Sequence, residues 1–413
     1  MFKVRARNVC TFLCMLLVAP GLHAQRQELE AYPALMNLIR AEKFEVVLPQ
    51  AMMDNDIDMW IQVIRGDEPL NFELGDNPGV YVFTDRGEEG VERAVLGGRA
   101  DRELYDVFGS ESDLGRFVAE RDPERIALNY AEEGSGFNTI SSEDRASVLA
   151  ALGDKYGGRV VSADRLIADF LAGRVMSEVA LYGRLLINST NIIESEFAKI
   201  VPGETRLSDI AGNVFVRDPD GNEENNTDYV VQPGDLIGVL HDASMREFSE
   251  HNGGIGYVLR EGETGLPPEV QRIWGHALKT REIFRSNIIA GRTGAETLEI
   301  LIDELEQAGY HYIDRDMYDT GADPEKTQVH IDFHALGRIV SQAEAPRISP
   351  TGWGRDLTIP LYHTFALEYM IHMPVPEWGR GKHLYICLHD GALVTERGVE
   401  FPARPAQEIL IIR

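Results

Sequence analysis

The chain has 413 residues, too many for one ordinary hydrophobic core, so we expect two domains. Apolar residues make up 44% and charged residues 26%, which is typical of a soluble globular protein. The formal charge of −27 repels phosphate backbones and anionic lipid headgroups, so nucleic acid and membranes are excluded as expected partners.

The first 24 residues have the pattern of a secretory signal peptide. A basic start with Lys3, Arg5 and Arg7 precedes an apolar run at residues 9–18, and a small residue follows at Ala24. The run is too short to span a bilayer, so we expect cleavage near Ala24 and export to the periplasm or the medium. The alternative is a disordered basic N-terminus. Cleavage would remove three positive charges and no negative ones, which changes −27 to −30.

The cysteine count limits how the exported chain can be stabilised. Cys10 and Cys14 would leave with the signal peptide, so only Cys387 would remain and no internal disulfide could form. Cys387 lies in the apolar run Leu-Tyr-Ile-Cys-Leu, which predicts a buried strand thiol rather than a nucleophile.

The first half of the mature chain predicts a compact α/β domain over residues 25–172. Its segments read as helix or strand from their apolar spacing and turn residues. Expected helices cover residues 31–65, broken by Pro33 and Pro49, and 144–152, and expected strands cover 79–83, 94–96, 125–130 and 159–161.

The second half, residues 173–413, predicts an α+β domain in which helices precede a mainly antiparallel sheet. Expected helices cover residues 162–199 (across the boundary), 207–213, 267–290 and 295–308. A strand is expected at residues 236–240, and the last hundred residues read mostly as strands.

Histidines are concentrated in this second half. Ten of the eleven fall between His241 and His389. Glu368 lies in an alternating apolar stretch, and His389 follows about twenty residues later. If residues 329–334 form a strand, then His330, Asp332 and His334 share one face, where they could add a ligand, an acid or a carboxylate that orients an imidazole.

Several longer motifs resemble one known family. They are RVMSEVALY at 174–182, PGET at 202–205, PGDL at 233–236, YVLREGE at 257–263, PPEVQ at 267–271, FALEYMI at 365–371, PVPEWG at 374–379 and LVTERG at 393–398. These motifs resemble the creatinase / Xaa-Pro aminopeptidase / methionine aminopeptidase family, the pita-bread metallopeptidases. The resemblance covers nearly the whole mature chain. It implies a small N-terminal α/β domain followed by a pita-bread domain.

The same resemblance implies a pair of divalent metals held by two Asp, one His and two Glu, which this chain matches only in part. Leu240 stands at the first Asp position and His251 at the second. Glu368 matches the first Glu, and His389 stands at the second Glu position. The His position falls on Thr327 without a gap, or near His330 if three residues are deleted. A further family histidine, used on the substrate, has no counterpart at residues 214–217.

These departures predict that a two-metal centre cannot form, because Leu240 cannot supply the carboxylate that bridges both ions. His251, Glu368 and His389 could instead hold one Zn, Mn or Fe ion. A shift by one or two residues onto His241-Asp242 is the alternative for Leu240.

Two functions remain open from the sequence. The first is a divergent metallohydrolase that acts on a small peptide or amide, with His334 or His330 as acid/base. The second is a catalytically inactive protein, without metal, that binds a peptide or partner in the relic cleft. The resemblance also implies a possible homodimer.

Overall fold

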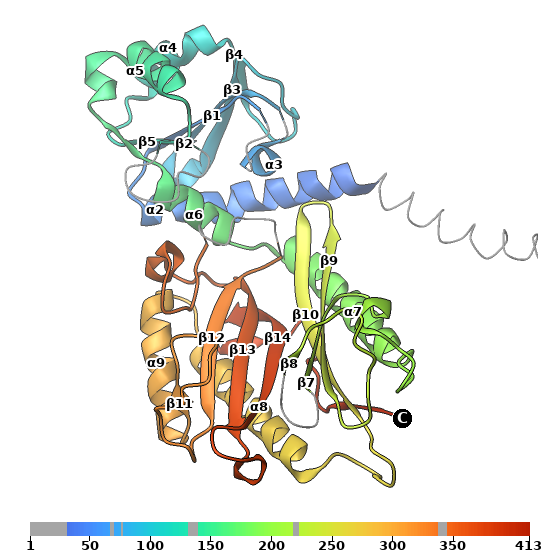
Figure 1. The fold of residues 1–413 in the computed structure, drawn as a ribbon. Coiled ribbons are helices and arrows are strands. Elements are labelled where there is room, and N and C mark those ends of the chain that lie inside the picture. Colours follow the sequence, from blue (N-terminus) through green and yellow to red (C-terminus); the bar gives the residue numbers. More distant parts are fainter. Residues whose placement is uncertain (1–30, 67–69, 76, 131–138, 218–222, 338–344) are drawn as a thin grey trace, which may run out of the picture.

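The computed structural model describes residues 31–66, 70–75, 77–130, 139–217, 223–337 and 345–413. The expected signal peptide at residues 1–24 lies outside these described residues. Within them, no helix combines the length and the apolar character needed to cross a bilayer. Figure 1 shows one sheet at the top, the helical segment 31–54 and α6 below it, and two further sheets at the bottom.

The upper sheet has six strands in the order β4-β3-β2-β1-β5-β6. The strands are β1 (Met59–Ile64), β2 (Gly79–Asp85), β3 (Val91–Leu96), β4 (Val107–Gly109), β5 (Ile126–Leu128) and β6 (Val160–Ser162). The central strand β1 pairs antiparallel with β2 and parallel with β5. Helices α4 (Leu114–Arg121) and α5 (Ser142–Gly157) pack on one face. Segment 31–54 and α6 (Asp164–Ala172) pack on the other.

The expectation of a helix over residues 31–65 is wrong in its last part. The helix continues through a π-helical stretch, Lys43–Val47, and α2 (Leu48–Asp54), and then Met59–Ile64 forms β1. All six residues of β1 are buried because both faces of the strand are covered, so the alternation that normally marks a strand is absent. Pro49 does not break the helix, since it lies in the first turn of α2, where a missing N–H costs little.

The expected single helix at residues 162–199 is two helices, α6 and α7 (Met176–Phe197). Gly173 leaves the helical conformation, and the Arg174 side chain then reaches three groups. Its guanidinium donates to the Leu171 carbonyl, to the Leu336 carbonyl and to Thr364 Oγ1. This break therefore ties the upper sheet to the lower ones.

The lower part contains two five-stranded sheets. The first has the order β16-β10-β9-β7-β8, with β7 (Asn213–Arg217), β8 (Glu223–Glu224), β9 (Leu236–Met245), β10 (Phe248–Val258) and β16 (Leu410–Ile412). The second has the order β11-β12-β13-β14-β15, with β11 (His311–Tyr312), β12 (Gln328–Ala335), β13 (Thr364–Pro374), β14 (His383–Thr395) and β15 (Gly398–Glu400). The helix expected at residues 207–213 is wrong: Leu207–Asp209 is one 3₁₀ turn, and β7 begins at Asn213.

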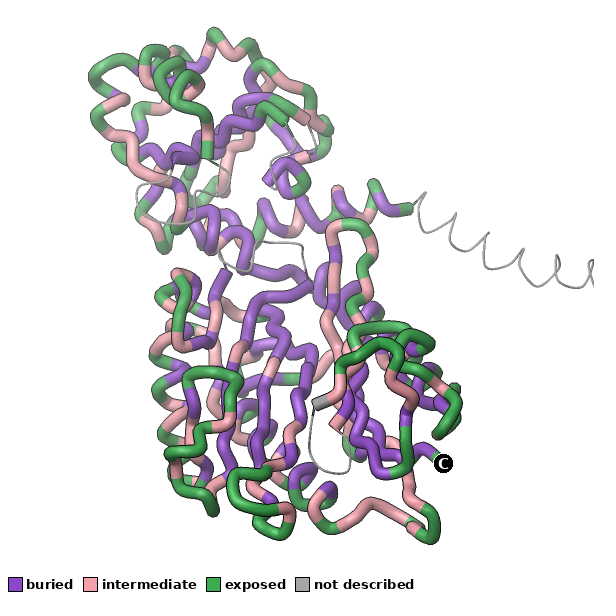
Figure 2. Tube along the Cα trace, viewed as in Figure 1, coloured by how far each residue is buried: buried purple, intermediate pink, exposed green. Residues whose placement is uncertain are grey.

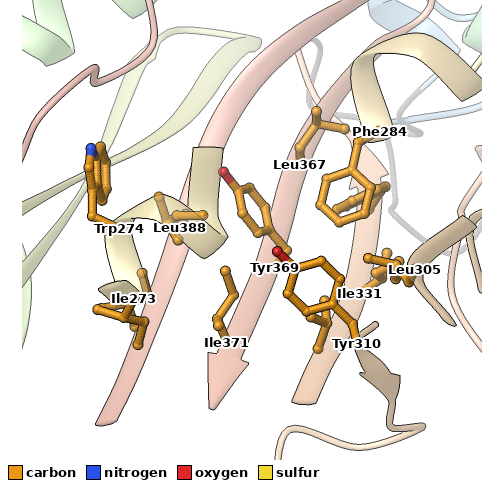
Figure 3. Close-up of a cluster of buried hydrophobic side chains, with 14 of the residues drawn as sticks. Ile273, Trp274, Phe284, Leu305, Tyr310, Ile331, Leu367, Tyr369, Ile371 and Leu388 are labelled. Carbon is orange, nitrogen blue, oxygen red and sulfur yellow. The ribbon is translucent and has the colours of Figure 1, made fainter. Parts of the chain in front are cut away.

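Helices cover one face of each lower sheet. Helix α7 packs on β9 and β10, while α8 (Pro268–Asn287) and α9 (Gly294–Gln307) pack on the second sheet. In Figure 3, Ile331, Leu367, Tyr369 and Leu388 meet side chains of α8 and α9 in one apolar core. Figure 2 shows the strands as mostly buried and the outer helix surfaces as exposed. Because side chains alternate along a strand, the other face of β12, β13 and β14 carries the polar residues.

Candidate metal centre

The register of the second sheet aligns three polar residues across three strands. Asp332 on β12 pairs with Glu368 on β13, and Glu368 pairs with His389 on β14. Residues directly opposite each other on neighbouring strands point to the same face. These side chains therefore lie on the face of the sheet that the helices leave uncovered.

Strand β10 of the other sheet contributes His251. Its ring centroid is 4.3 Å from that of His389. One ligand atom each from His251, Glu368 and His389 lies within 4.8 Å of the other two. Ligands of one tetrahedral zinc at about 2.1 Å stand about 3.4 Å apart. His389 Nε2 and Glu368 Oε1 are 3.7 Å apart, so a small contraction would let one ion bind.

His334 is the other imidazole at this group. Its Nε2 is 3.5 Å from Glu368 Oε2, and its ring centroid is 6.1 Å from that of His251. His330 lies two residues earlier on β12, opposite Met370, and its Nδ1 donates to the Ile313 carbonyl. Thr327 Oγ1 instead lies 3.4 Å from His276 Nε2, a residue of α8. His334, which the sequence suggested as an acid/base, therefore lies beside Glu368, whereas Thr327 and His330, the two residues considered for the imidazole position, make these other contacts.

Two carboxylates have roles that the sequence did not reveal. Asp332 binds Arg347 through both of its oxygens, with Nε to Oδ1 at 2.8 Å, so it does not orient an imidazole. Asp242 does so instead, because its Oδ1 contacts Nδ1 of His251. Strand pairing places Asp242 directly opposite His251. A metal-binding histidine commonly donates its second nitrogen to a carboxylate, which fixes the ring and leaves Nε2 for the metal.

Leu240 lies where the sequence placed it, next to the group. It pairs with Gly253, and a Cβ on Gly253 would lie 2.9 Å from Leu240 Cδ2 and 3.5 Å from the Cβ of His389. The next residue, His241, turns to the opposite face, where its Nδ1 is 3.2 Å from Ser189 Oγ. His241 therefore lies away from the group, whereas Asp242, two residues after Leu240, pairs with His251, so the alternative of a shift onto His241-Asp242 stays open.

The group has a buried side and an accessible side. The side chain of His389 is 1% exposed, whereas those of His251 and Glu368 are 21% and 23% exposed. Burial lowers the pKa of His389 well below its ordinary value, and the neighbouring His251 and His334 lower it further. The ring is therefore neutral, as a metal ligand must be. Its buried Nδ1 makes no hydrogen bond with any residue that the structure describes.

Cys387 lies closer to the ligand group than its sequence pattern predicted. It is buried as expected, but its Sγ lies 3.1 Å from Nε2 of His389. Burial raises the pKa of the Cys387 thiol well above its ordinary value, so without metal the group is protonated. The alternation along β14 could have revealed this contact, since Cys387 and His389 are two residues apart and share a face.

No family model and no curated protein sequence matches the chain. Solved structures do resemble it. An X-Pro aminopeptidase from Thermotoga maritima has a TM-score of 0.54 and 16% identity, over 88% of this chain and 100% of that one. An Xaa-Pro dipeptidase from Bacillus anthracis has a TM-score of 0.54 and 14% identity, over 90% of this chain and 100% of that one. Dipeptidase PepE from Mycobacterium ulcerans has a TM-score of 0.53 and 13% identity, over 91% of this chain and 98% of that one.

Likeness at this level of identity establishes the fold. The chain has the pita-bread fold of the Xaa-Pro peptidases, preceded by a smaller α/β part, so the expected α+β architecture is confirmed. Helix α6 ends at Ala172, where the sequence placed a domain boundary; that boundary stays a prediction.

Proposed function

We propose that this chain is a metallohydrolase that binds one divalent cation through His251, Glu368 and His389 and acts on small peptides or amides. The observation that carries the proposal is the convergence of these three ligands, from strands of two sheets, within 4.8 Å. Two imidazoles and one carboxylate suit a single Zn, Mn or Fe ion with an open position. Such an ion lowers the pKa of a bound water and polarises the carbonyl of an amide.

The charges around the group support one ion rather than two. Two cations at close range repel each other and need anionic ligands to hold them. Glu368 is the one carboxylate of the three-residue group. The nearby carboxylates are engaged elsewhere: Asp332 with Arg347, Asp390 with Arg281, and Asp242 with the far nitrogen of His251. Leu240, which pairs with Gly253 near the group, offers an aliphatic side chain and no ligand atom.

His334 is our choice for the acid/base. It is within reach of Glu368, and it sits at the edge of the ligand group rather than inside it. An imidazole there could take a proton from the attacking water and return it to the leaving amine. His330 is the second choice. Its Nδ1 donates to the Ile313 carbonyl, and it lies opposite Met370 on β13 rather than beside Glu368.

The test combines metal binding with hydrolysis. The protein is stripped of metal, titrated with Zn²⁺, Mn²⁺ or Fe²⁺ by calorimetry, and assayed on Xaa-Pro dipeptides and simple amides. We expect one equivalent of metal and metal-dependent cleavage, with both abolished in His389→Ala. His311→Ala is the matched control, since this partly exposed histidine pairs with Glu306 and lies outside the group. His334→Ala should keep the metal and lose cleavage; loss of the metal would make His334 a ligand instead.

The alternative is a protein without catalysis that binds a peptide or partner at the same place. Leu240 favours it, because an aliphatic residue beside His389 is what a site without metal would tolerate. Peptide binding that persists in a chelator, together with no metal uptake and no cleavage, would establish this alternative.

Export, the absence of nucleic-acid and membrane partners, and a homodimer complete the proposal. Recovery of protein beginning at Gln25 outside the cytoplasm would support export. Light scattering would give the number of chains in the particle.

A further inference from the structure

We infer that Cys387 supplies a fourth ligand, so that the site takes a thiolate-preferring ion such as Zn²⁺ or Co²⁺ rather than Mn²⁺. The inference rests on the proposed single-metal site and adds the class of metal to it. The sequence predicted a buried strand thiol rather than a nucleophile, and the structure places this thiol against His389.

The backbone aims Cys387 at the group. Cys387 and His389 alternate along β14, so both point away from the core that α8 and α9 cover, whereas Ile386 and Leu388 belong to that core. Strand pairing sets Cys387 opposite Met370, one alternation away from the pair Glu368–His389. A regular antiparallel strand holds these positions without a loop having to move.

The distances around His389 Nε2 fit two neighbours of one ion. Cys387 Sγ lies 3.1 Å from this nitrogen, and Glu368 Oε1 lies 3.7 Å from it. Zinc bound to sulfur at about 2.3 Å and to nitrogen at about 2.1 Å holds these two ligands roughly 3.6 Å apart. The sulfur contacts the three-residue group through His389 but lies outside the group itself, so the Cys387 side chain would have to move toward His251 and Glu368 for one ion to bind all four ligands.

Metal binding would replace the contact between Cys387 and His389 with two metal–ligand bonds, one from each residue. Without metal, the Cys387 thiol is placed to donate its hydrogen to His389 Nε2. For Cys387 to hold a divalent ion, its thiol would lose one proton to solvent, and the lone pair of His389 Nε2 would then be free to hold the same ion. No electron is transferred, so no oxidant or reductant is needed.

Charge supports the same assignment. Glu368 and a thiolate together carry two negative charges, which neutralise one divalent ion. His389 and Cys387 are both buried, and a charge left uncompensated there would be costly. Thiolate is a soft ligand that zinc and cobalt accept, while manganese prefers carboxylate, carbonyl and water oxygens. The fourth ligand therefore selects among the ions that the other three would accept.

The test uses Co²⁺ as a spectroscopic probe of the full chain. We expect one equivalent of Co²⁺ and a thiolate-to-cobalt charge-transfer band in the near ultraviolet. Cys387→Ser should abolish the band. The double variant Cys10→Ser, Cys14→Ser should keep it, which excludes the two N-terminal cysteines as its source. Zn²⁺-loaded protein should show a sulfur neighbour at about 2.3 Å by X-ray absorption.

Affinity gives a second readout. Loss of an outer hydrogen-bond partner of a ligand costs roughly 10–100-fold in metal affinity. Cys387→Ser should weaken Zn²⁺ binding by more than this and leave Mn²⁺ binding almost unchanged, and urea unfolding of the metal-free protein checks that the variant folds. If it does not, the spectra of the wild type and the double variant still decide the question.

The outcomes separate the two proposals. One bound Co²⁺ without a thiolate band, or zinc affinity that Cys387→Ser leaves intact, would overturn the role of Cys387 and leave the three-ligand site standing. No bound Co²⁺ and no bound Zn²⁺ would overturn both.

Discussion

At the scale of single residues, Asp242 has a specific role toward His251. Its carboxylate accepts from Nδ1, which leaves Nε2 as the nitrogen that can bind metal. Asp242→Asn should therefore weaken metal binding by roughly 10–100-fold and leave stability without metal nearly unchanged, because the side chain is largely exposed. Calorimetric titration checks this result. Asp56→Asn, at an exposed position on the upper part, should bind metal as the wild type does.

His363 should make stability depend on pH. The ring is fully buried, its Nδ1 donates to the Ala172 carbonyl, and burial lowers its pKa to about 3. Since the unfolded chain has the higher pKa, near 6.5, it binds the proton first as pH falls. The stabilisation is therefore complete above pH 6.5 and is lost toward pH 3, at up to about 1.4 kcal/mol per pH unit.

His363→Asn isolates this contribution. The Asn amide can donate to Ala172 but does not titrate, so the free energy of unfolding should fall less steeply from about pH 6 to about pH 4.5 than in the wild type. Urea unfolding at a series of pH values measures both slopes. Equal slopes for the two proteins would show that His363 does not titrate on unfolding.

Residue patterns predicted part of the site. Because a strand alternates, His330, Asp332 and His334 share a face as expected. The pattern could not show that Arg347, from a later segment, would engage Asp332, or that Asp242 would contact His251. The contact of Arg347 with Asp332 depends on how two separate segments pack. The contact of Asp242 with His251 depends on the register of two strands. A local sequence pattern contains neither kind of information.

At the scale of elements, α7 approaches β10 closely enough to require glycine. A Cβ on Gly254 would lie 2.6 Å from Ile193 Cγ2 and 3.0 Å from Phe197 Cε2. Gly254→Ala should therefore lower the free energy of unfolding by about 1–3 kcal/mol through overpacking. Gly275→Ala, in α8 with no atom within 4 Å, should instead be neutral or stabilise by about 0.5–1 kcal/mol. Urea unfolding of both variants tests the pair, and equal effects would contradict this packing.

Helices were predicted best where one face is apolar. The expected segments 267–290 and 295–308 closely match α8 and α9, whose buried residues recur at helical spacing. Strand β1 was missed because it is buried on both faces. The break between α6 and α7 was missed because apolar residues continue through it, and the Arg174 contacts that accompany it lie far along the chain.

At the scale of the whole molecule, the candidate centre joins two sheets. His251 comes from β10, and Glu368 and His389 come from β13 and β14. One ion bound there should stabilise the fold by about 2.7 kcal/mol at a free concentration 100 times the Kd. Differential scanning calorimetry should show a higher Tm with metal in the wild type and in His311→Ala, and no rise in His389→Ala. A rise that persists in His389→Ala would place the binding elsewhere.

The overall architecture was predicted from motifs, and the chemistry only in part. The resemblance of segments such as PVPEWG to the pita-bread family gave the correct fold, because those segments lie at turns and strands that the fold requires. The motifs named Glu368 and His389 as candidate ligands but could not show how close they lie. The register of β13 with β14 places the two residues opposite each other.

The most direct test of the single-ion centre is the anomalous diffraction of crystals grown with Zn²⁺ and, separately, with Co²⁺. We predict one peak per chain, bonded to His251, Glu368 and His389, with Leu240 packed beside it. Two peaks a few ångström apart, or none at this group, would contradict the account.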